Sequence, residues 1–422
     1  MTNEQIKTDV YAMGKKARTA AHALAVLSEG EKNEILLAMA VELRGQSADI
    51  IEANTKDLEA GEKRDLSKAL LDRLRLDEAR VDAVAAGIEK VAKLNDPVGE
   101  VLEEWTRPNG IRIEKIRVPI GVIGIIYESR PNVTSDAAVL CLKSGNATIL
   151  RGGSEAIYSN RAIAKALQAG GEKKGLPEGA IQLIPFTDRE SVSVMAGMDK
   201  YLDLIIPRGG KGLIEAVVSQ ARMPVIKHYD GICHAFVDRK ADQQMAVDIV
   251  VNSKTHKPSV CNALETLLID GAIAEEFLPK VAAALWEKKV SLRGDERTRK
   301  ILGDKVEAAT EEDWQTEYLD YILSVKVVPG IDEAIAHINH YSSQHTEVII
   351  SADEDKAARF MRELDSACIF HNVSTRFSDG EEFGFGAEIG ISTDKLHARG
   401  PMGLRELTSY QYRVRGEGQV KS

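Results

Sequence analysis

The pattern of hydrophobic and polar positions changes along the chain near Pro97 and again near Pro119. Before Pro97, apolar residues recur at spacings of three and four, which is typical of amphipathic helices. Three stretches carry this spacing: Ala17–Leu27, Ile35–Leu43 and Leu66–Val91. We therefore predict that residues 3–95 are helical.

Beyond Pro97, alternation of apolar and polar residues indicates a β-ribbon. The turn pair Asn109-Gly110 precedes a run with period two, Ile111–Val118. This predicts a hairpin over Arg107–Val118 with one apolar face, which needs a surface to lie against. Ser409–Val414, near the C-terminus, alternates in the same way, and we expect it to pair with a sheet edge or with another subunit.

From Pro119 onward, strand and helix patterns alternate. Ile120–Tyr127 is an unbroken apolar run, as expected for a strand covered on both faces. It precedes a helix over Asn132–Lys143, with capping residues at its start and Ser144-Gly145-Asn146 at its end. Such alternation predicts an α/β fold with a parallel sheet and right-handed crossovers. The other predicted strands are Ala147–Arg151, Ile181–Pro185, Leu202–Ile206, His234–Val237, Ala263–Ile269, Ser324–Val328 and Val348–Ile350, and the other predicted helices include Ser154–Gly170, Ile273–Glu287 and Asp332–Asn339.

Composition narrows the class of protein. The 422 residues suffice for two or three domains, and a net charge of −10 disfavours a nucleic-acid-binding protein. No apolar run approaches the length of a membrane span, and the polar N-terminus lacks the layout of a signal peptide. The four cysteines are too widely spaced for a disulfide framework. We expect a protein of the reducing cytoplasm.

Two glycine-rich segments follow predicted strands, Arg151–Ser154 and Pro207–Gly212. Parallel sheets bind ligands at the carboxyl ends of their strands, where glycines let a phosphate approach backbone N–H groups. The alternative is that the glycines only make the turn from strand to helix. Two such segments on consecutive units of one sheet favour a nucleotide.

Cys261 differs from the other three cysteines in its surroundings. Cys141, Cys233 and Cys368 lie in or beside apolar segments and are predicted to be buried. Cys261 follows Lys254-Thr255-His256-Lys257-Pro258, a polar and cationic approach of the kind that favours a thiolate. A nucleophile and an ordinary buried thiol both remain open at this point.

A metal site is the alternative interpretation of three histidines that lie close together, His337, His340 and His345. His337 and His340 share a face of the predicted helix, but no usual zinc-ligand pattern accompanies them. We predict a solvated helix end and no metal.

Seven segments, in order along nearly the whole chain, resemble those of the gamma-glutamyl phosphate reductase (glutamate-5-semialdehyde dehydrogenase) family, within the aldehyde dehydrogenase superfamily. They are Val118–Thr134, Leu150–Ala156, Ile206–Gly210, His228–His234, Lys257–Ala263, Glu388–Thr393 and Arg399–Leu404.

The resemblance implies an aldehyde-dehydrogenase-like α/β fold in three parts. Residues 1–106 and 119–230 would form a Rossmann-like NADP-binding domain, and residues 231–403 an α/β catalytic domain with the nucleophilic cysteine. Residues 107–118 and 404–416 would form a β oligomerisation arm, so a homo-oligomer is implied.

The implied reaction is the NADPH-dependent reduction of L-glutamyl 5-phosphate to L-glutamate 5-semialdehyde and phosphate, in proline biosynthesis. The residues leave the choice between NADPH and NADH open. They also leave open the number of subunits, and whether the upstream glutamate kinase makes a transient contact to pass on the acyl phosphate.

The resemblance also assigns roles to single residues. Cys261 stands at the position of the nucleophile, and Asn132 at that of the amide that holds the oxyanion with the cysteine's own N–H. Arg151 lies where a lysine usually contacts the adenosine ribose, and an arginine there suits a 2′-phosphate. The remaining cofactor-binding expectations are Gly209 and Gly210 at the turn packed against the pyrophosphate, Glu317 at the nicotinamide-side ribose, and Ser154.

One position departs from the superfamily pattern. His228 stands where hydrolytic members have the glutamate that activates water. A phosphorylating reductase does not need that base, so the departure argues against an irreversible oxidase. Candidates for holding the substrate's phosphate and α-carboxylate, by location alone, are Lys395, His397, Arg399, Arg376, Asn372 and Ser374. The rival interpretations are a hydrolytic aldehyde dehydrogenase, a non-catalytic nucleotide-binding oligomer, and a helical scaffold built on residues 3–95.

Overall fold

The computed structural model describes residues 1–128 and 130–421, so Ser129 of the first resembling segment and Ser422 lie outside it. The chain divides into two compact units. The first comprises residues 1–227, 384–390 and 402–422, and the second comprises residues 228–383 and 391–401. Residues 384–390, expected in the catalytic domain, therefore group with the first unit.

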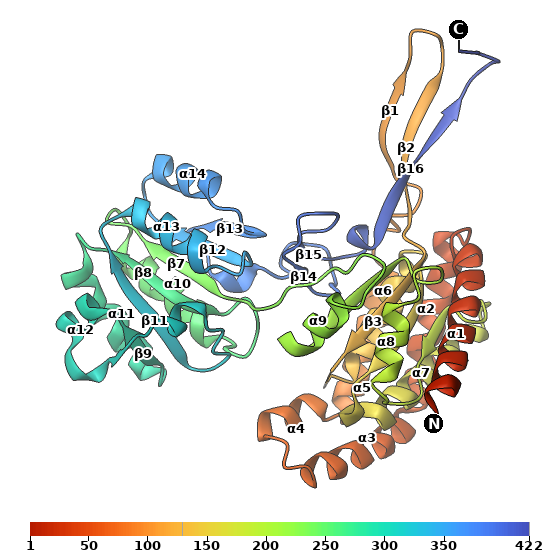
Figure 1. Cartoon of the computed structure of the whole chain (residues 1–422), viewed down its shortest axis with the longest axis horizontal. Helices are drawn as coiled ribbons and strands as arrows, with labels where there is room; N and C mark the ends of the chain where they lie inside the picture. Colours follow the sequence, from red (N-terminus) through yellow and green to blue (C-terminus); the bar gives the residue numbers. More distant parts are fainter. Residues whose placement is uncertain (129, 422) are drawn as a thin grey trace. The chain divides into compact units, whose positions relative to one another are not determined.

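The first unit contains the helical N-terminal region, a parallel sheet and a β-ribbon (Figure 1). Its helices are α1 (Asn3–Leu24), α2 (Glu29–Gly45), α3 (Ser47–Glu62), α4 (Lys68–Leu74), α5 (Glu78–Ala92), α6 (Asn132–Lys143), α7 (Ile157–Glu172), α8 (Glu190–Ala196) and α9 (Lys211–Val218), with short 3₁₀ turns at Ser154–Ala156 and Arg405–Leu407. Its strands are β1 (Val101–Thr106), β2 (Arg112–Pro119), β3 (Val122–Tyr127), β4 (Ala147–Gly152), β5 (Ile181–Leu183), β6 (Leu204–Arg208) and β16 (Thr408–Arg415).

Four parallel strands form the central sheet of this unit, in the order β5-β4-β3-β6. All six residues of β3 are buried, as the unbroken apolar run Ile120–Tyr127 predicted, and so are all six of β4. The predicted helical N-terminal region is confirmed, with one correction. The expected continuous stretch Leu66–Val91 is two helices, because Asp77 accepts a hydrogen bond from the Arg80 N–H and starts α5.

The ribbon is a separate antiparallel sheet in the order β1-β2-β16, which extends away from the helices of its own unit (Figure 1). The hairpin turn at Asn109-Gly110 is confirmed, with Gly110 at φ 87°. The expected boundary at residue 107 was wrong, because the first strand of the hairpin is Val101–Thr106. Of the two partners expected for the C-terminal strand, a sheet edge is the one found within the chain.

The second unit is built on a parallel sheet in the order β10-β9-β11-β8-β7-β12-β13. Its strands are β7 (Cys233–Val237), β8 (Leu264–Asp270), β9 (Ser291–Gly294), β10 (Glu307–Ala308), β11 (Ile322–Val328), β12 (Thr346–Ile350), β13 (Cys368–His371), and the small pair β14 (Ile391–Ser392) and β15 (Gly400–Pro401). Its helices are α10 (Gln243–Thr255), α11 (Ala274–Glu287), α12 (Glu296–Leu302), α13 (Ile331–Tyr341) and α14 (Glu354–Glu363), with 3₁₀ turns η2 (Gly303–Lys305), η3 (Glu312–Gln315) and η4 (Thr375–Phe377).

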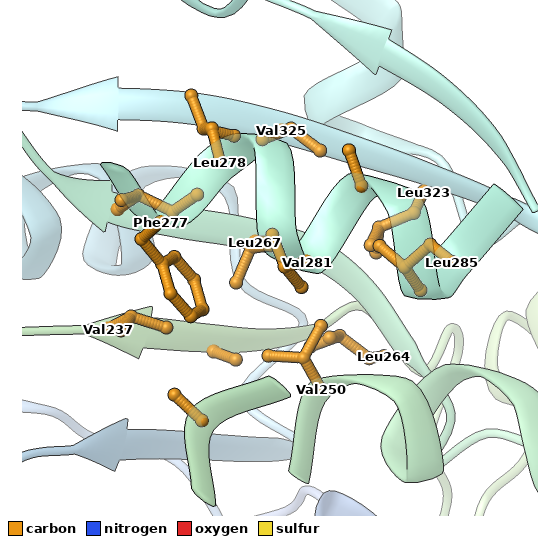
Figure 2. Packing of buried hydrophobic residues seen from close by; sticks show 14 of the residues in the cluster. Val237, Val250, Leu264, Leu267, Phe277, Leu278, Val281, Leu285, Leu323 and Val325 are labelled. Carbon is orange, nitrogen blue, oxygen red and sulfur yellow. The ribbon is translucent and has the colours of Figure 1, made fainter. Parts of the chain in front are cut away.

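A hydrophobic core joins α10 and α11 to one face of this sheet. Figure 2 shows Phe277 and Val281 of α11 among Leu264 and Leu267 of β8, with Val250 of α10 beside them. These side chains are fully or almost fully buried. The core therefore holds the last turns of α10 and the start of β8 in place, and the chain between them carries Cys261. No helix in the described part of the chain is long and apolar enough to cross a membrane.

Candidate active site

Cys261 lies in the irregular segment between α10 and β8, and its thiol is free and half-buried. The other three cysteines, Cys141, Cys233 and Cys368, are free and buried, which confirms the prediction made for them. Cys261 is thus the most accessible thiol of the four.

A buried ion pair joins the helix before the Cys261 segment to the strand after it. Lys254, in the last turn of α10, donates to Glu265, on β8, with Nζ and Oε2 2.6 Å apart and both side chains fully buried. Burial raises the pKa of Glu265 to about 7, and burial also lowers the pKa of Lys254. Lys254 was expected to provide positive charge to the thiol, but its ammonium is bound to Glu265 instead.

Breaking this buried pair should destabilise the second unit strongly. Glu265→Leu leaves the Lys254 ammonium buried without its carboxylate, which typically costs about 3–5 kcal/mol. The double variant Lys254→Met/Glu265→Leu replaces both charges with apolar groups of similar volume and should recover most of that loss. Urea denaturation of the three proteins measures the effect, and equal stability of the single and double variants would contradict it.

Gly231 lies directly against the backbone of Cys261. A Cβ built on Gly231 would lie 2.5 Å from Cys261 Cα and 2.6 Å from its carbonyl carbon, closer than real Cβ contacts. The N–H of Gly231 also hydrogen-bonds the Glu317 carboxylate, whose pKa is nevertheless raised by burial. Cys261 and Glu317, two of the residues singled out from sequence, therefore flank the same glycine.

Cys233 and two histidines lie behind the Cys261 segment. Cys233 Sγ donates to the Cys261 carbonyl oxygen at 3.2 Å, and burial raises the pKa of the Cys233 thiol well above its usual value. His345 Nδ1 is 3.8 Å from that sulfur, and its ring packs edge-on against the ring of His228 at 5.8 Å. His228 stands where hydrolytic aldehyde dehydrogenases have a glutamate, and in this structure its imidazole packs against the imidazole of His345.

The 3₁₀ turn η4 binds to the residue after the thiol. Thr375 Oγ1 donates to the Asn262 carbonyl oxygen at 2.7 Å, and Asn262 Nδ2 donates to the Ser378 carbonyl oxygen at 2.8 Å. Between them is Arg376, whose charge interacts electrostatically with Cys261. Arg376, from a distant part of the chain, therefore brings a positive charge to the Cys261 segment.

Most of the other substrate-anion candidates are occupied by partners within the protein. Lys395 and Arg399 both pair with the Asp365 carboxylate. Asn372 accepts from the Ser351 N–H and donates to the Ser351 carbonyl oxygen, both at 2.9 Å. Ser374 shares a hydrogen bond of 3.0 Å with Ser253. His397 has a positive φ of 65°.

Asn132, in the first unit, is the first residue of α6. Its amide does not cap the helix, because Pro131 stands at the N-cap, so the expected side-chain cap is not used. Instead, Asn132 Nδ2 donates to Asp136 Oδ2, one turn later, at 2.8 Å. Burial raises the pKa of Asp136 to about 6. This contact fixes one amide hydrogen of Asn132 and leaves the other for a second acceptor.

The two glycine-rich segments differ in the charged side chain that lies at each of them and in the hydrogen bonds that it makes. Arg151 is buried at the end of β4 and donates to the Thr187 and Gly152 carbonyl oxygens, while Ser154 is exposed. At the second segment, the Gly210 N–H donates to Glu128 Oε2 at 3.0 Å. A carboxylate oxygen therefore lies at the N-terminus of α9, where a phosphate oxygen was expected.

The three neighbouring histidines do not share one environment. His337 is buried, with its ring against Trp314 and Tyr341, and its pKa is held far below the usual value by burial and nearby positive charge. The prediction of a solvated helix end was therefore wrong for His337, while His340 is exposed. Within residues 1–128 and 130–421, no group of three or more His, Cys, Asp or Glu side chains is arranged to hold a metal ion.

Comparisons with known proteins extend this picture over the whole chain. A model of the aldehyde dehydrogenase family matches residues 2–303. Gamma-glutamyl phosphate reductase of Geobacter sp. (strain M21) is 57% identical over 418 residues, covering 99% of this chain and 99% of the relative. The chain belongs to the gamma-glutamyl phosphate reductase family. Another member, from Geobacter metallireducens, is 55% identical over 418 residues, again with 99% of each chain covered.

The crystal structure of the gamma-glutamyl phosphate reductase from Thermotoga maritima superposes with a TM-score of 0.96 at 47% identity, covering 98% of this chain and 100% of that one. The fold is therefore the α/β fold of the aldehyde dehydrogenases, with parallel sheets, as predicted. Membership of the gamma-glutamyl phosphate reductase family makes the chain an oxidoreductase and implies a nicotinamide cofactor.

Proposed function

We propose that this chain reduces L-glutamyl 5-phosphate to L-glutamate 5-semialdehyde and phosphate with NADPH, through a thioester on Cys261, as a step of proline biosynthesis. The observation that carries the proposal is identity of 55–57% to gamma-glutamyl phosphate reductases over 99% of the chain. The half-buried thiol of Cys261, in a segment bound on both sides, is the matching chemical feature. Four free thiols also fit a reducing cytoplasm.

Cys261 is the nucleophile in this proposal. Its sulfur attacks the acyl carbon, a C–S bond forms, and the C–O bond to phosphate breaks, with the thiol proton leaving on the departing hydrogen phosphate. The backbone N–H of Cys261 and the second amide hydrogen of Asn132 stabilise the oxyanion. Losing one such donor typically costs about 10²–10³ in rate.

A nicotinamide cofactor, when bound, would supply hydride to reduce the thioester. Breaking the C–S bond returns the Cys261 sulfur as a thiolate, which takes up a proton from water before the next turnover. The turn before α9 fits its pyrophosphate, because the Gly210 N–H already binds an anionic oxygen and nothing lies within 4 Å of a Cβ placed there. Gly209 and Ser154 are assigned to the same phosphates. Arg151 is assigned to the adenosine ribose, where its charge suits NADPH, and Glu317 to the nicotinamide-side ribose.

His228 separates this proposal from the hydrolytic rival. A hydrolytic aldehyde dehydrogenase needs a carboxylate to activate water, and this position holds an imidazole that packs on His345. Phosphate is itself a competent nucleophile, so the reverse reaction needs no water-activating base. Without such a base, the thioester is not hydrolysed quickly and persists until phosphate attacks it.

The test is the reverse reaction, with L-glutamate 5-semialdehyde and NADP⁺ in the presence and absence of phosphate. We expect steady turnover only with phosphate, and a single burst of NADPH without it. A steady rate that is indifferent to phosphate would favour the hydrolytic rival. No NADPH under either condition would leave only a nucleotide-binding protein or a scaffold.

We also propose a homo-oligomer assembled through the β-ribbon, together with a transient contact to the kinase that supplies the acyl phosphate. The ribbon exposes an aromatic cluster in which Trp105 and Tyr410 each pack against Tyr412, with ring centres 6.1 and 5.7 Å away. Tyr410 and Tyr412 are about half exposed in the single chain, at 51% and 56%. Exposed aromatic side chains of this kind are frequent anchors of interfaces.

Tyr412→Glu should therefore dissociate the oligomer. Removing an interface anchor costs about 2 kcal/mol or more, or roughly 30-fold in association. Light scattering after size exclusion should give a lower mass for this variant than for the parent. The control is Tyr158→Glu, on the exposed face of α7. Equal masses for all three proteins would contradict assembly through the ribbon.

A further inference from the structure

The η4 turn is fixed to the Cys261 segment from both sides. The hydrogen bonds Thr375 to Asn262 and Asn262 to Ser378 join it to the residue next to the nucleophile. The hydroxyl groups of Ser253, in α10, and Ser374 share a hydrogen bond. The Ser253 hydroxyl oxygen also accepts a hydrogen bond of 3.1 Å from the Thr375 N–H. Side chains on this turn therefore keep their position relative to the thiol.

Two hydrogen-bond donors on this turn are buried without a partner. They are Arg376 Nη1 and the hydroxyl of Ser378. Arg376 Nε makes a bond of 3.4 Å to His256 Nδ1, which leaves Nη1 unused. A buried donor without an acceptor is energetically costly, so a pair of them on one turn indicates that an acceptor is missing. Asn262 Oδ1, a buried acceptor on the facing segment, is also without a partner.

The charge of Arg376 is also incompletely compensated. Burial lowers the pKa of its guanidinium, while the Asp379 carboxylate favours its charged form, as does the Cys261 sulfur when it is a thiolate. Among the ion pairs of the described residues, none joins a carboxylate to Arg376 within 4.0 Å. A bound anion would supply both the missing acceptor and the missing charge.

We propose that Arg376 Nη1 and Ser378 Oγ bind the phosphoryl group of the acyl phosphate, and bind phosphate itself in the reverse reaction. This inference rests on the proposed function. The phosphoryl group is attached to the carbon that Cys261 attacks, so its site must keep its position relative to the thiol, as η4 does. The α-carboxylate lies at the far end of the glutamyl chain. Arginine suits phosphate because its planar N–H groups match the oxygens and it stays charged.

The reverse reaction tests this inference, because there the phosphate and the carboxylate are on different molecules. Arg376→Gln should raise the KM for inorganic phosphate about 10- to 100-fold, as expected for loss of a charge-assisted hydrogen bond. The KM for the semialdehyde and the NADPH burst without phosphate should stay within about twofold, since neither involves phosphate. Arg376→Lys should give an intermediate phosphate KM. Ser378→Ala should raise it about 2- to 10-fold.

The control is Arg362→Gln on α14, an exposed arginine in the same unit, which should change no KM. A raised semialdehyde KM with normal phosphate KM would overturn the inference and place the carboxylate at Arg376. Unchanged constants in Arg376→Gln would also overturn it. Absence of the burst in the parent would instead refute the proposed function.

Protection of Cys261 against alkylation is a second measurement, which tests the inference even if Arg376→Gln folds poorly. Inorganic phosphate should slow alkylation of Cys261 in the parent and in Arg362→Gln. In Arg376→Lys, protection should need about tenfold more phosphate, matching the change in KM. Protection at the same phosphate concentration in all three proteins would overturn the inference.

Discussion

Replacing Cys261 with alanine should abolish turnover in both directions. Removing a covalent nucleophile costs on the order of 10⁴–10⁶ in rate, because binding and oxyanion stabilisation alone cannot replace the bond it forms. NADPH affinity, measured by fluorescence titration, should be unchanged within about twofold, since the thiol is not assigned a role in binding the cofactor. The burst of NADPH without phosphate should disappear as well.

Cys368→Ala is the matched control, because it removes a thiol that is buried on β13. It should keep the rate of the parent within a few-fold and lose only some stability, about 1 kcal/mol for a small buried group. Turnover that survives in Cys261→Ala would eliminate the thioester mechanism. A non-catalytic nucleotide-binding oligomer would show no turnover in the parent either.

Gly231→Ala should also slow the reaction strongly, although it adds a single methyl group. The new Cβ would collide with backbone atoms of Cys261, and backbone cannot yield as a flexible side chain does. Either the Cys261 segment or the Gly231 segment must then move by about 1 Å, a displacement that can cost about 10² in rate. We expect kcat to fall by that order, together with a lower midpoint of urea denaturation.

Gly87→Ala serves as the control for this substitution. Gly87 lies inside α5 with nothing within 4 Å of a new Cβ, so alanine should stabilise the helix by about 0.5–1 kcal/mol and leave kcat unchanged. Normal kcat in Gly231→Ala would mean that the position of the Cys261 backbone does not control the reaction.

The helices and strands that were predicted well are those whose positions are marked by neighbouring residues in the sequence. The helix Asn132–Lys143 and the strand ending at Tyr127 were predicted at or close to their observed bounds, since apolar runs and turn residues mark them. The strand Val101–Thr106 was not predicted. Its sequence is rich in acidic residues, and it is extended because it pairs with β2. The short strand Ser291–Gly294 likewise depends on its parallel neighbours, which are distant in sequence.

The candidate site also contains residues that local sequence identifies and contacts that it does not. Cys261 was recognisable from its immediate neighbours, whereas the contact with Gly231 joins segments 30 positions apart by their residue numbers. Arg376 was only one of several cations near the C-terminal end. Its selection required knowing that Lys395 and Arg399 share Asp365 and that η4 binds to Asn262. Local patterns do not contain such pairings.

The place of β16 in the ribbon has a consequence for shortened versions of the protein. β16 covers one side of β2 along its whole length, from Thr408 opposite Pro119 to Arg415 opposite Arg112. A chain cut before Thr408 would leave the backbone of β2 open along that side, and bare strand edges of this kind recruit further chains into aggregates. Truncations at this end should therefore precipitate, and fused tags belong beyond Arg415.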